Sequence, residues 1–217
     1  MYELPTYSPI TFIICMGIGL LFAFFSSEQR LKTSILLAIW CIITASISYT
    51  PELPLKPFFL FFVPCLLLTL FSLIPAGRQF VRELKDEHLH YLHLWRLPFA
   101  FVLLWFYQAG LSSLDITFEG YNYDIVVGLT APVIASLAFN QKMLNREILL
   151  GWNGLSLLML LISSVLIGLE MQHSVKALNA YTSFPYAFAL GLLLPMSLFA
   201  HALVIYRILK GYVKIAE

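Results

Sequence analysis

Residues 90–106 read HYLHLWRLPFAFVLLWF, in which two histidines and an arginine lead directly into a long apolar run. Apolar runs of about 20 residues are typical of helices that cross a lipid bilayer. A cation at the edge of such a run is costly unless it lies near the interface or finds polar partners. The position of Arg96 therefore bears on both the course of the helices and the location of a polar site.

The composition indicates that lipid is the solvent of this chain. Sixty per cent of its 217 residues are hydrophobic, only 12% are charged, and the mean hydropathy is +0.84. A single soluble core of this size cannot bury such an excess of apolar side chains. The net charge of +1 gives no indication of a nucleic-acid partner. Cys15, Cys41 and Cys65 lie inside apolar runs without CxxC spacing, so we expect small core residues there.

Seven apolar stretches approach the length needed to cross a bilayer, and turn-forming residues separate them. The second and the fifth have about 17 residues, the lower end of the range. The sequence therefore predicts an all-α polytopic membrane protein, a single transmembrane domain over residues 1–217 built as a bundle of seven helices. The predicted spans are about 8–27, 33–49, 57–75, 92–111, 123–139, 149–169 and 185–208.

The basic residues predict the orientation of these spans. Ten of them follow the first, third, fifth and seventh spans, whereas only Lys56 and Lys176 lie in the loops on the other side. Because Lys and Arg gather in cytoplasmic loops, this bias predicts an N-terminus outside and a C-terminus in the cytoplasm. No basic residue precedes the first span, so we expect that span to be retained and not cleaved as a signal peptide. The ten are Arg30, Lys32, Arg78, Arg82, Lys85, Lys142, Arg146, Arg207, Lys210 and Lys214.

Residues 78–91 differ from the spans on either side of them. Charges cluster in RELKDEH, and apolar residues recur beyond it at helical spacing. This pattern predicts an amphipathic cytoplasmic segment that leads into the fourth span and places Arg96 near the inner interface. One interpretation is that Arg96 snorkels towards water and lipid phosphate, while Trp95 belongs to the aromatic belt.

A second interpretation gives Arg96 protein partners at the same depth. The sixth span carries Trp152 and Asn153 in its first turns, and His201 lies six residues, or about 9 Å, before Arg207 in the seventh. Polar groups on different helices turn towards one another in a bilayer. We therefore predict a polar cluster near the cytoplasmic face that is a candidate ligand-binding site and that the Arg96 guanidinium faces. Its members are Arg96, His93, Asn153, His201, Trp152 and Ser197.

Histidine ligation of a metal or of haem is a further interpretation. His90 and His93 are three apart on a predicted helix and, with Glu87 nearby, are weak candidates for binding a transition metal. His93 and His201 are a weak candidate pair of axial ligands for a b-type haem. Polar residues on a wet interfacial helix explain the histidines more simply, so no cofactor is favoured. Retinal is not expected, because the seventh span contains no lysine for a Schiff base.

A second polar set is predicted in the outer half of the bundle. Gln108 ends the fourth span, Glu119 and Asn122 lie in the following loop, and Asp124 opens the fifth span. An acidic side chain in the first turn of a helix satisfies free amides and complements the helix dipole, which is sufficient to explain Asp124. The alternative is a carboxylate that binds a ligand or handles a proton.

Residues 90–208 carry four short motifs: LWRLPFAF followed by YQAGL, FEGYNYDIVVGLTAPVIA, WNGLSLL, and FPYAFALGLLLPMSLFAHAL. Together they resemble a group of small, uncharacterised bacterial multi-pass inner-membrane proteins. Where that group has a glycine and an aspartate shortly after Trp-Asn, this chain has Ser156 and Met159, which puts any activity shared with the group in question. The resemblance implies a bacterial inner-membrane location and no particular reaction, and it implies that Arg96, Asn153, Asp124 and His201 act as a set. The matching positions are Arg96, Gly110, Asp124, Gly128, Thr130, Ala131, Trp152, Asn153, Pro195 and His201.

Three classes of function fit these observations. The favoured one is a small-ligand-binding membrane protein that acts as a sensor or transporter; the others are an accessory or structural subunit of a larger membrane complex and a haem- or metal-dependent membrane redox protein. An enzyme is disfavoured but not excluded, since no P-loop, GxSxG elbow or Ser/His/Asp arrangement is present. The expected location is the bacterial cytoplasmic (inner) membrane. The expected partners are the lipid bilayer and, for an accessory subunit, other membrane subunits.

Overall fold

The computed structural model of the chain describes residues 3–50, 53 and 55–213, and every regular element in these ranges is a helix. Six of the helices are long and apolar enough to cross a membrane. The predicted all-α architecture is confirmed, and it is compatible with a helical membrane bundle. The six are α1 (Ser8–Ser26), α2 (Arg30–Tyr49), α3 (Lys56–Leu73), the helix over Asp86–Gln108, α8 (Arg146–His173) and the helix over Ala189–Leu209.

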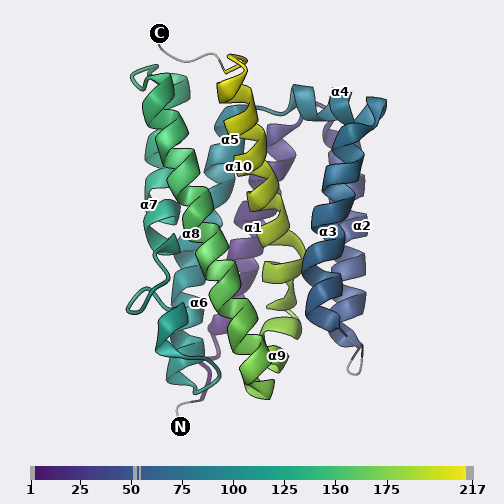
Figure 1. Cartoon of the computed structure of the whole chain (residues 1–217). Coiled ribbons are helices and arrows are strands. Elements are labelled where there is room, and N and C mark those ends of the chain that lie inside the picture. The colour runs from purple at the N-terminus through teal and green to yellow at the C-terminus, as the bar shows by residue number, and fades with distance from the viewer. Residues whose placement is uncertain (1–2, 51–52, 54, 214–217) are drawn as a thin grey trace.

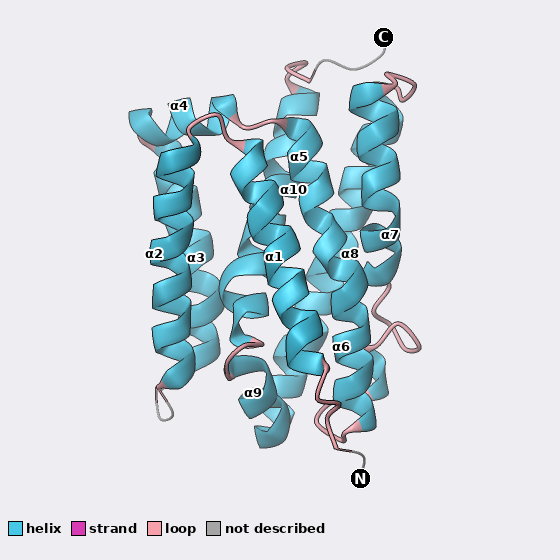
Figure 2. Cartoon of the chain, turned by 180° about the vertical axis from the view of Figure 1, so that it is seen from behind, coloured by secondary structure: helices cyan, strands magenta, loops and turns pink. Residues whose placement is uncertain are grey.

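The long helices run side by side, and α2 and α3 form a hairpin at one side of the bundle (Figure 1). The start of α1 and the end of α10 (Leu194–Leu209) lie at opposite ends of the bundle. The short helix α4 (Pro75–Glu83) lies across the hairpin at the α10 end, and α9 (Val175–Thr182) lies at the other end (Figure 2). The bundle therefore has two distinct ends, and α4 lies over the hairpin at one of them.

The fourth membrane-length helix begins six residues before its predicted start. It consists of α5 (Asp86–Tyr91), the 3-10 turn η1 (Leu92–Trp95) and α6 (Arg96–Gln108) in direct succession. The predicted amphipathic segment 78–91 is thereby divided, because its first part belongs to α4 and its second part is the first turns of this helix. Arg96 consequently lies in the middle of a 23-residue helix, and not near its end as predicted.

Arg207 of α10 allows the charged start of this helix to enter the bundle. Its side chain is buried and forms an ion pair with Asp86. The same guanidinium donates to the backbone carbonyls of Leu84 at 2.7 Å and of Val81 at 2.5 Å. These bonds use the fork of guanidinium donors and fix the connection between α4 and α5 to the end of α10.

The fifth predicted span corresponds to a shorter helix than the other six. Helix α7 (Asp124–Ala135) continues into the π-helical turn η3 (Ser136–Asn140). The apolar helix over residues 124–140 is short of the length that the other six reach. It begins part of the way along the bundle and not at its end (Figure 1).

The loop before α7 is packed against protein along part of its length. It contains the 3-10 turn η2 (Leu114–Ile116), and Thr117 and Asn122 in it are buried. Asn122 Oδ1 accepts hydrogen bonds from the Asp124 backbone amide at 3.1 Å and from the Ser163 hydroxyl of α8 at 2.8 Å. Side chains of the bundle thus satisfy polar groups in this irregular segment.

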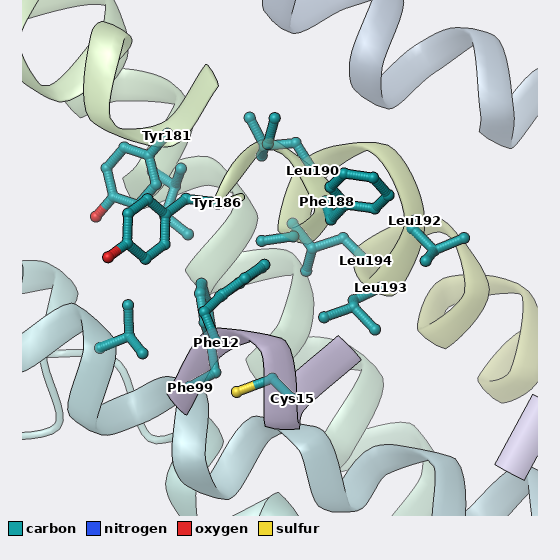
Figure 3. Close-up of a cluster of buried hydrophobic side chains, with 14 of the residues drawn as sticks. Phe12, Cys15, Phe99, Tyr181, Tyr186, Phe188, Leu190, Leu192, Leu193 and Leu194 are labelled. Atoms are coloured by element: carbon teal, nitrogen blue, oxygen red, sulfur yellow. The ribbon is translucent and has the colours of Figure 1, made fainter. Parts of the chain in front are cut away.

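An aromatic core joins the helices at the α9 end of the bundle (Figure 3). The ring of Phe12 lies 5.8 Å from that of Phe99 and 5.3 Å from that of Tyr186, in both cases edge to face. The π-helical segment η4 (Ala189–Leu193) is buried throughout beside these rings. Trp40 of α2 donates from its indole nitrogen to the carbonyl of Gly191 at 2.5 Å, which fixes the hairpin to η4.

Helices α6 and α7 approach one another at Gly128. A Cβ atom at this position would lie 2.4 Å from the Leu97 backbone nitrogen and 2.9 Å from the Leu97 Cα atom. Any side chain would therefore push the two backbones apart, since neither of these atoms can rotate away. Small residues permit close approach of this kind between membrane helices.

We expect Gly128→Ala to lower the free energy of unfolding by about 1–3 kcal/mol, the usual cost of overpacking a filled interior. The thermal midpoint of the purified protein in detergent measures this change. Gly154→Ala in α8 is the matched control, because a Cβ atom there meets nothing within 4 Å. Equal midpoints for the two variants would contradict the close approach of α6 and α7.

Candidate functional site

Arg96 is the centre of a buried polar cluster. Its side chain is 1% exposed, at the junction of η1 and α6. The Arg96 Nη2 atom donates to His201 Nε2 of α10 at 3.0 Å. The Nη1 atom lies 3.4 Å from both Asp124 Oδ1 of α7 and the backbone carbonyl oxygen of Ser156 in α8. The guanidinium faces protein and bonds His201 directly, whereas Asn153, the other acceptor expected in this layer, is reached only through His201.

A chain of hydrogen bonds continues from Arg96 through three other side chains. His201 Nδ1 bonds Asn153 Oδ1 at 3.1 Å, and Asn153 Nδ2 bonds His90 Nε2 at 3.0 Å. His90 Nδ1 then bonds the backbone carbonyl of Asp86 at 2.7 Å. We call Arg96, Asp124, His201, Asn153 and His90 the arginine network. It joins α5, α6, α7, α8 and α10.

The hydrogen-bond pattern determines the proton positions on both histidines of the network. Arginine can only donate, so His201 Nε2 accepts and its Nδ1 carries the proton that goes to Asn153 Oδ1. The amide nitrogen of Asn153 also donates to the Leu149 carbonyl at 2.9 Å, which confirms which end of the amide faces His90. His90 Nε2 therefore accepts, and its Nδ1–H donates to Asp86. Both imidazoles are neutral in this arrangement, and Arg96 and Asp124 supply the opposite charges.

Aromatic rings enclose the network. The His93 and His201 rings stack with their centroids 3.8 Å apart and their planes inclined by 9°. The Trp152 ring lies 5.5 Å from that of His90 and 6.0 Å from that of His201, and its indole nitrogen donates to Thr130 Oγ1 at 3.1 Å. Trp152 and His93 thus border the cluster through their ring faces and edges.

The geometry does not fit a haem held by His93 and His201. Two axial ligands must face each other from opposite sides of a macrocycle and point a nitrogen at its iron. Here the two rings are in direct face-to-face contact. His90 uses both of its nitrogens in hydrogen bonds, and no group of three metal-binding side chains occurs within residues 3–50, 53 and 55–213.

The predicted outer polar set is divided in the structure. Asp124 does not stay with Gln108 and Glu119 but lies in the arginine network, because α7 begins part of the way along the bundle next to α6. Gln108 and Glu119 are exposed and contribute nothing to that cluster. Ser197 lies beside the network and accepts a hydrogen bond from the Trp95 indole nitrogen at 2.9 Å. Sequence spacing did not predict the Arg96–Asp124 pair, since it depends on where α7 starts.

Two buried nitrogens, Arg96 Nε in the network and His93 Nδ1 beside it, have no hydrogen-bond partner among the residues that the structure describes. Every other nitrogen named in the hydrogen-bond chain has a hydrogen-bond partner. The predicted role of this cluster in ligand binding stays a prediction. What the geometry does show is a set of side chains that bond chiefly to one another.

A cavity of about 450 Å³ lies between the α2–α3 hairpin and the rest of the bundle. Helix α2 lines it from Thr33 to Ile47, and α3 lines it from Phe59 to Phe71. Side chains of α1, α4, α5, α10 and the turns beside them line the remaining walls, and we call the cavity the hairpin slot. Its lining is apolar apart from the hydroxyls of Ser26, Thr33 and Thr44 and the indole nitrogen of Trp40.

The hairpin slot and the arginine network share two helices. Leu89 and Leu92 line the slot, whereas the adjacent His90 and His93 lie in or beside the network. In the same way, α10 presents Met196 and Phe199 to the slot and His201 to Arg96. The sequence contained one signal for the slot, the repeat of Thr33, Leu37, Trp40, Thr44 and Ile47 along one face of α2.

Comparison of the chain with protein-family models, with curated proteins and with solved structures finds no match in any of the three. The resemblance of residues 90–208 to bacterial inner-membrane proteins therefore stays a prediction.

We expect Arg96→Leu to destabilise the protein by about 3–5 kcal/mol, because it leaves the Asp124 carboxylate buried without its cation. Arg96→Lys should restore only part of the loss, since an ammonium group does not reproduce the guanidinium fork. Thermal midpoints in detergent measure both effects. Arg78→Leu is the control, because Arg78 is exposed on α4. If Arg96→Leu unfolded at the same temperature as Arg78→Leu, the network would not hold the bundle together.

Proposed function

We propose that this chain is a seven-span membrane protein, with its N-terminus outside and its C-terminus in the cytoplasm, that binds a small ligand with a long hydrocarbon chain in the hairpin slot. Its location would be the bacterial inner membrane, and its action would be that of a sensor or transporter. The observation that carries the proposal is the slot itself, an apolar cavity between helices of membrane-spanning length.

The distribution of basic residues supports the orientation. Arg30, Arg78, Arg207 and the basic residues near them belong to turns and helix ends at the α4 end of the bundle (Figure 1). The other end has Lys56 at the start of α3 and Lys176 in α9. An excess of Lys and Arg on one side is typical of the cytoplasmic side of a membrane protein.

The short α7 counts as the fifth span in this proposal. The 17 residues from Asp124 to Asn140 rise by about 25 Å, somewhat less than the roughly 30 Å of a hydrocarbon core. The loop before α7 would complete the crossing, and its buried Thr117 and Asn122 support this, since irregular backbone at membrane depth must be covered by protein.

A reporter fused after Lys142, between α7 and α8, should report the cytoplasm, and so should one fused after Glu217. A reporter fused after His173, at the end of α8, should report the outside. Each position is tested with two reporters, alkaline phosphatase and green fluorescent protein, which are active on opposite sides of the membrane. An external signal at Lys142 would show that α7 does not cross the membrane.

The size and shape of the slot support a ligand with a hydrocarbon chain. Its volume of about 450 Å³ falls in the range of roughly 300–1,000 Å³ that is common for small-molecule sites. The 14-residue step from Thr33 to Ile47 on α2 corresponds to a length of about 21 Å. This exceeds the roughly 15 Å depth of one leaflet of a bilayer core, so an extended acyl chain fits along it.

The arginine network has a supporting role in this proposal. It joins α5 and α10, whose opposite faces form the inner wall of the slot. Because its bonds fix these helices relative to one another, the slot has one rigid wall. The α2–α3 hairpin, which the Trp40–Gly191 hydrogen bond joins to η4, forms the other wall.

We expect Ala23→Trp to reduce the lipid that remains bound to the purified protein about tenfold or more, because the indole would occupy the slot that Ala23 lines. Ala38→Trp is the matched control, since Ala38 is exposed on α2 and does not line the slot. Mass spectrometry of the lipid extracted after a detergent wash measures the retained amount. Equal retention by the two variants, or none by the unaltered protein, would overturn the proposal.

A further inference from the structure

We infer that the ligand of the hairpin slot is an anionic membrane phospholipid, with an acyl chain in the slot and its phosphate held by basic side chains at the α4 end. This inference rests on the proposed function and adds the class of ligand. We call the basic side chains at the slot end the basic collar. Its members are Arg30 and Lys32 at the start of α2 and Arg78 and Arg82 of α4.

The basic collar adjoins one end of the slot. Lys32 immediately precedes Thr33, which lines the slot, and Arg82 immediately follows Val81, which also lines it. The α4 helix lies across this end of the hairpin (Figure 2). Its Phe80 and Val81 line the cavity. Because α4 is amphipathic, its exposed Arg78 and Arg82 are available to a headgroup at the same end.

The charges of the collar are not neutralised by acidic residues of the chain. Segments 28–32 and 75–85 contain five basic and two acidic side chains, a net charge of +3. Glu28 forms an ion pair with Lys85 at 3.7 Å. Glu83 accepts from the amide of Gln29 at 2.5 Å and from that of Gln79 at 3.3 Å. No collar residue forms an ion pair within the described residues.

The other end of the slot lacks a comparable cluster in the part that the structure describes. Lys56 is the one basic residue of the hairpin there, and its ammonium group donates to the Ser48 carbonyl at 2.8 Å. The charge asymmetry therefore gives the bound lipid a direction. Its headgroup lies at the α4 end and its chain extends towards η4.

The chemistry of the collar selects phosphate. An arginine fork donates two parallel hydrogen bonds to phosphate oxygens, and lysine adds a point charge. Clusters of basic residues next to membrane helices attract anionic headgroups with about 1 kcal/mol for each Lys or Arg near the surface. A zwitterionic headgroup carries its own cation, so it competes with the collar and gains less.

The test uses the full-length protein in detergent, supplied with phosphatidylglycerol or with phosphatidylcholine of identical acyl chains. We expect the protein to retain the anionic lipid about tenfold better, and the preference should fall as salt is added. The variant Arg78→Gln/Arg82→Gln should lose this preference and leave phosphatidylcholine retention unchanged. Lys142→Gln/Lys210→Gln, which removes two exposed charges from the same end but away from the slot, should keep it.

The outcomes separate this inference from the proposed function. If both lipids are retained equally and Ala23→Trp lowers both, the slot binds acyl chains but the inference about the headgroup is wrong. If neither lipid is retained, the proposed function fails as well. If the Lys142→Gln/Lys210→Gln control loses the preference as fully as the collar variant, the preference reflects overall charge and the collar is not the site.

Discussion

The constraint on which the rest of this structure depends is the burial of one guanidinium in the middle of a membrane-length helix. Arg96 cannot lose its proton and must have acceptors on several sides. Asp124, His201 and the Ser156 carbonyl supply them from three other helices. The packing of α6 against α7, α8 and α10 therefore satisfies a polar requirement as well as an apolar one. The close approach at Gly128 is part of the same arrangement, since it brings the start of α7 beside Arg96.

Helices α5 and α10 connect the arginine network to the hairpin slot on the other side of the bundle. Helices α5 and α10 carry polar side chains towards Arg96 and apolar side chains towards the hairpin slot. Arg207 fixes their adjoining ends through Asp86 and the carbonyls of Leu84 and Val81. The inner wall of the slot is consequently held at both the middle and the end of the bundle.

The α2–α3 hairpin is held less firmly than this inner wall. Helices α2 and α3 leave apolar side chains exposed over much of their length, and the Trp40–Gly191 bond attaches them near η4. In the proposed function, a hydrocarbon chain enters the cavity between this rigid wall and the peripheral hairpin from the bilayer. The proposed role of the basic collar is to give such a ligand a preferred headgroup and direction. The proposal thus combines the apolar lining of the slot with the charge at its α4 end.

The sequence by itself determined the all-α class and the approximate positions of six membrane-length helices, and it offered a shared polar layer of Arg96, Asn153 and His201 as one of two interpretations. Hydrophobic length and the depth of residues along a helix are local properties, so they can be predicted without the fold. Only the tertiary structure decided that Arg96 lies mid-helix, that Asp124 is its counter-ion, and that His90 belongs to the network while Gln108 and Glu119 do not. Each of these depends on where a helix begins and which helix is its neighbour, and spacing within a single segment does not contain that information. The hairpin slot was likewise decided by the tertiary structure, because six helices from separate parts of the chain line it and the sequence signalled only the face that α2 contributes.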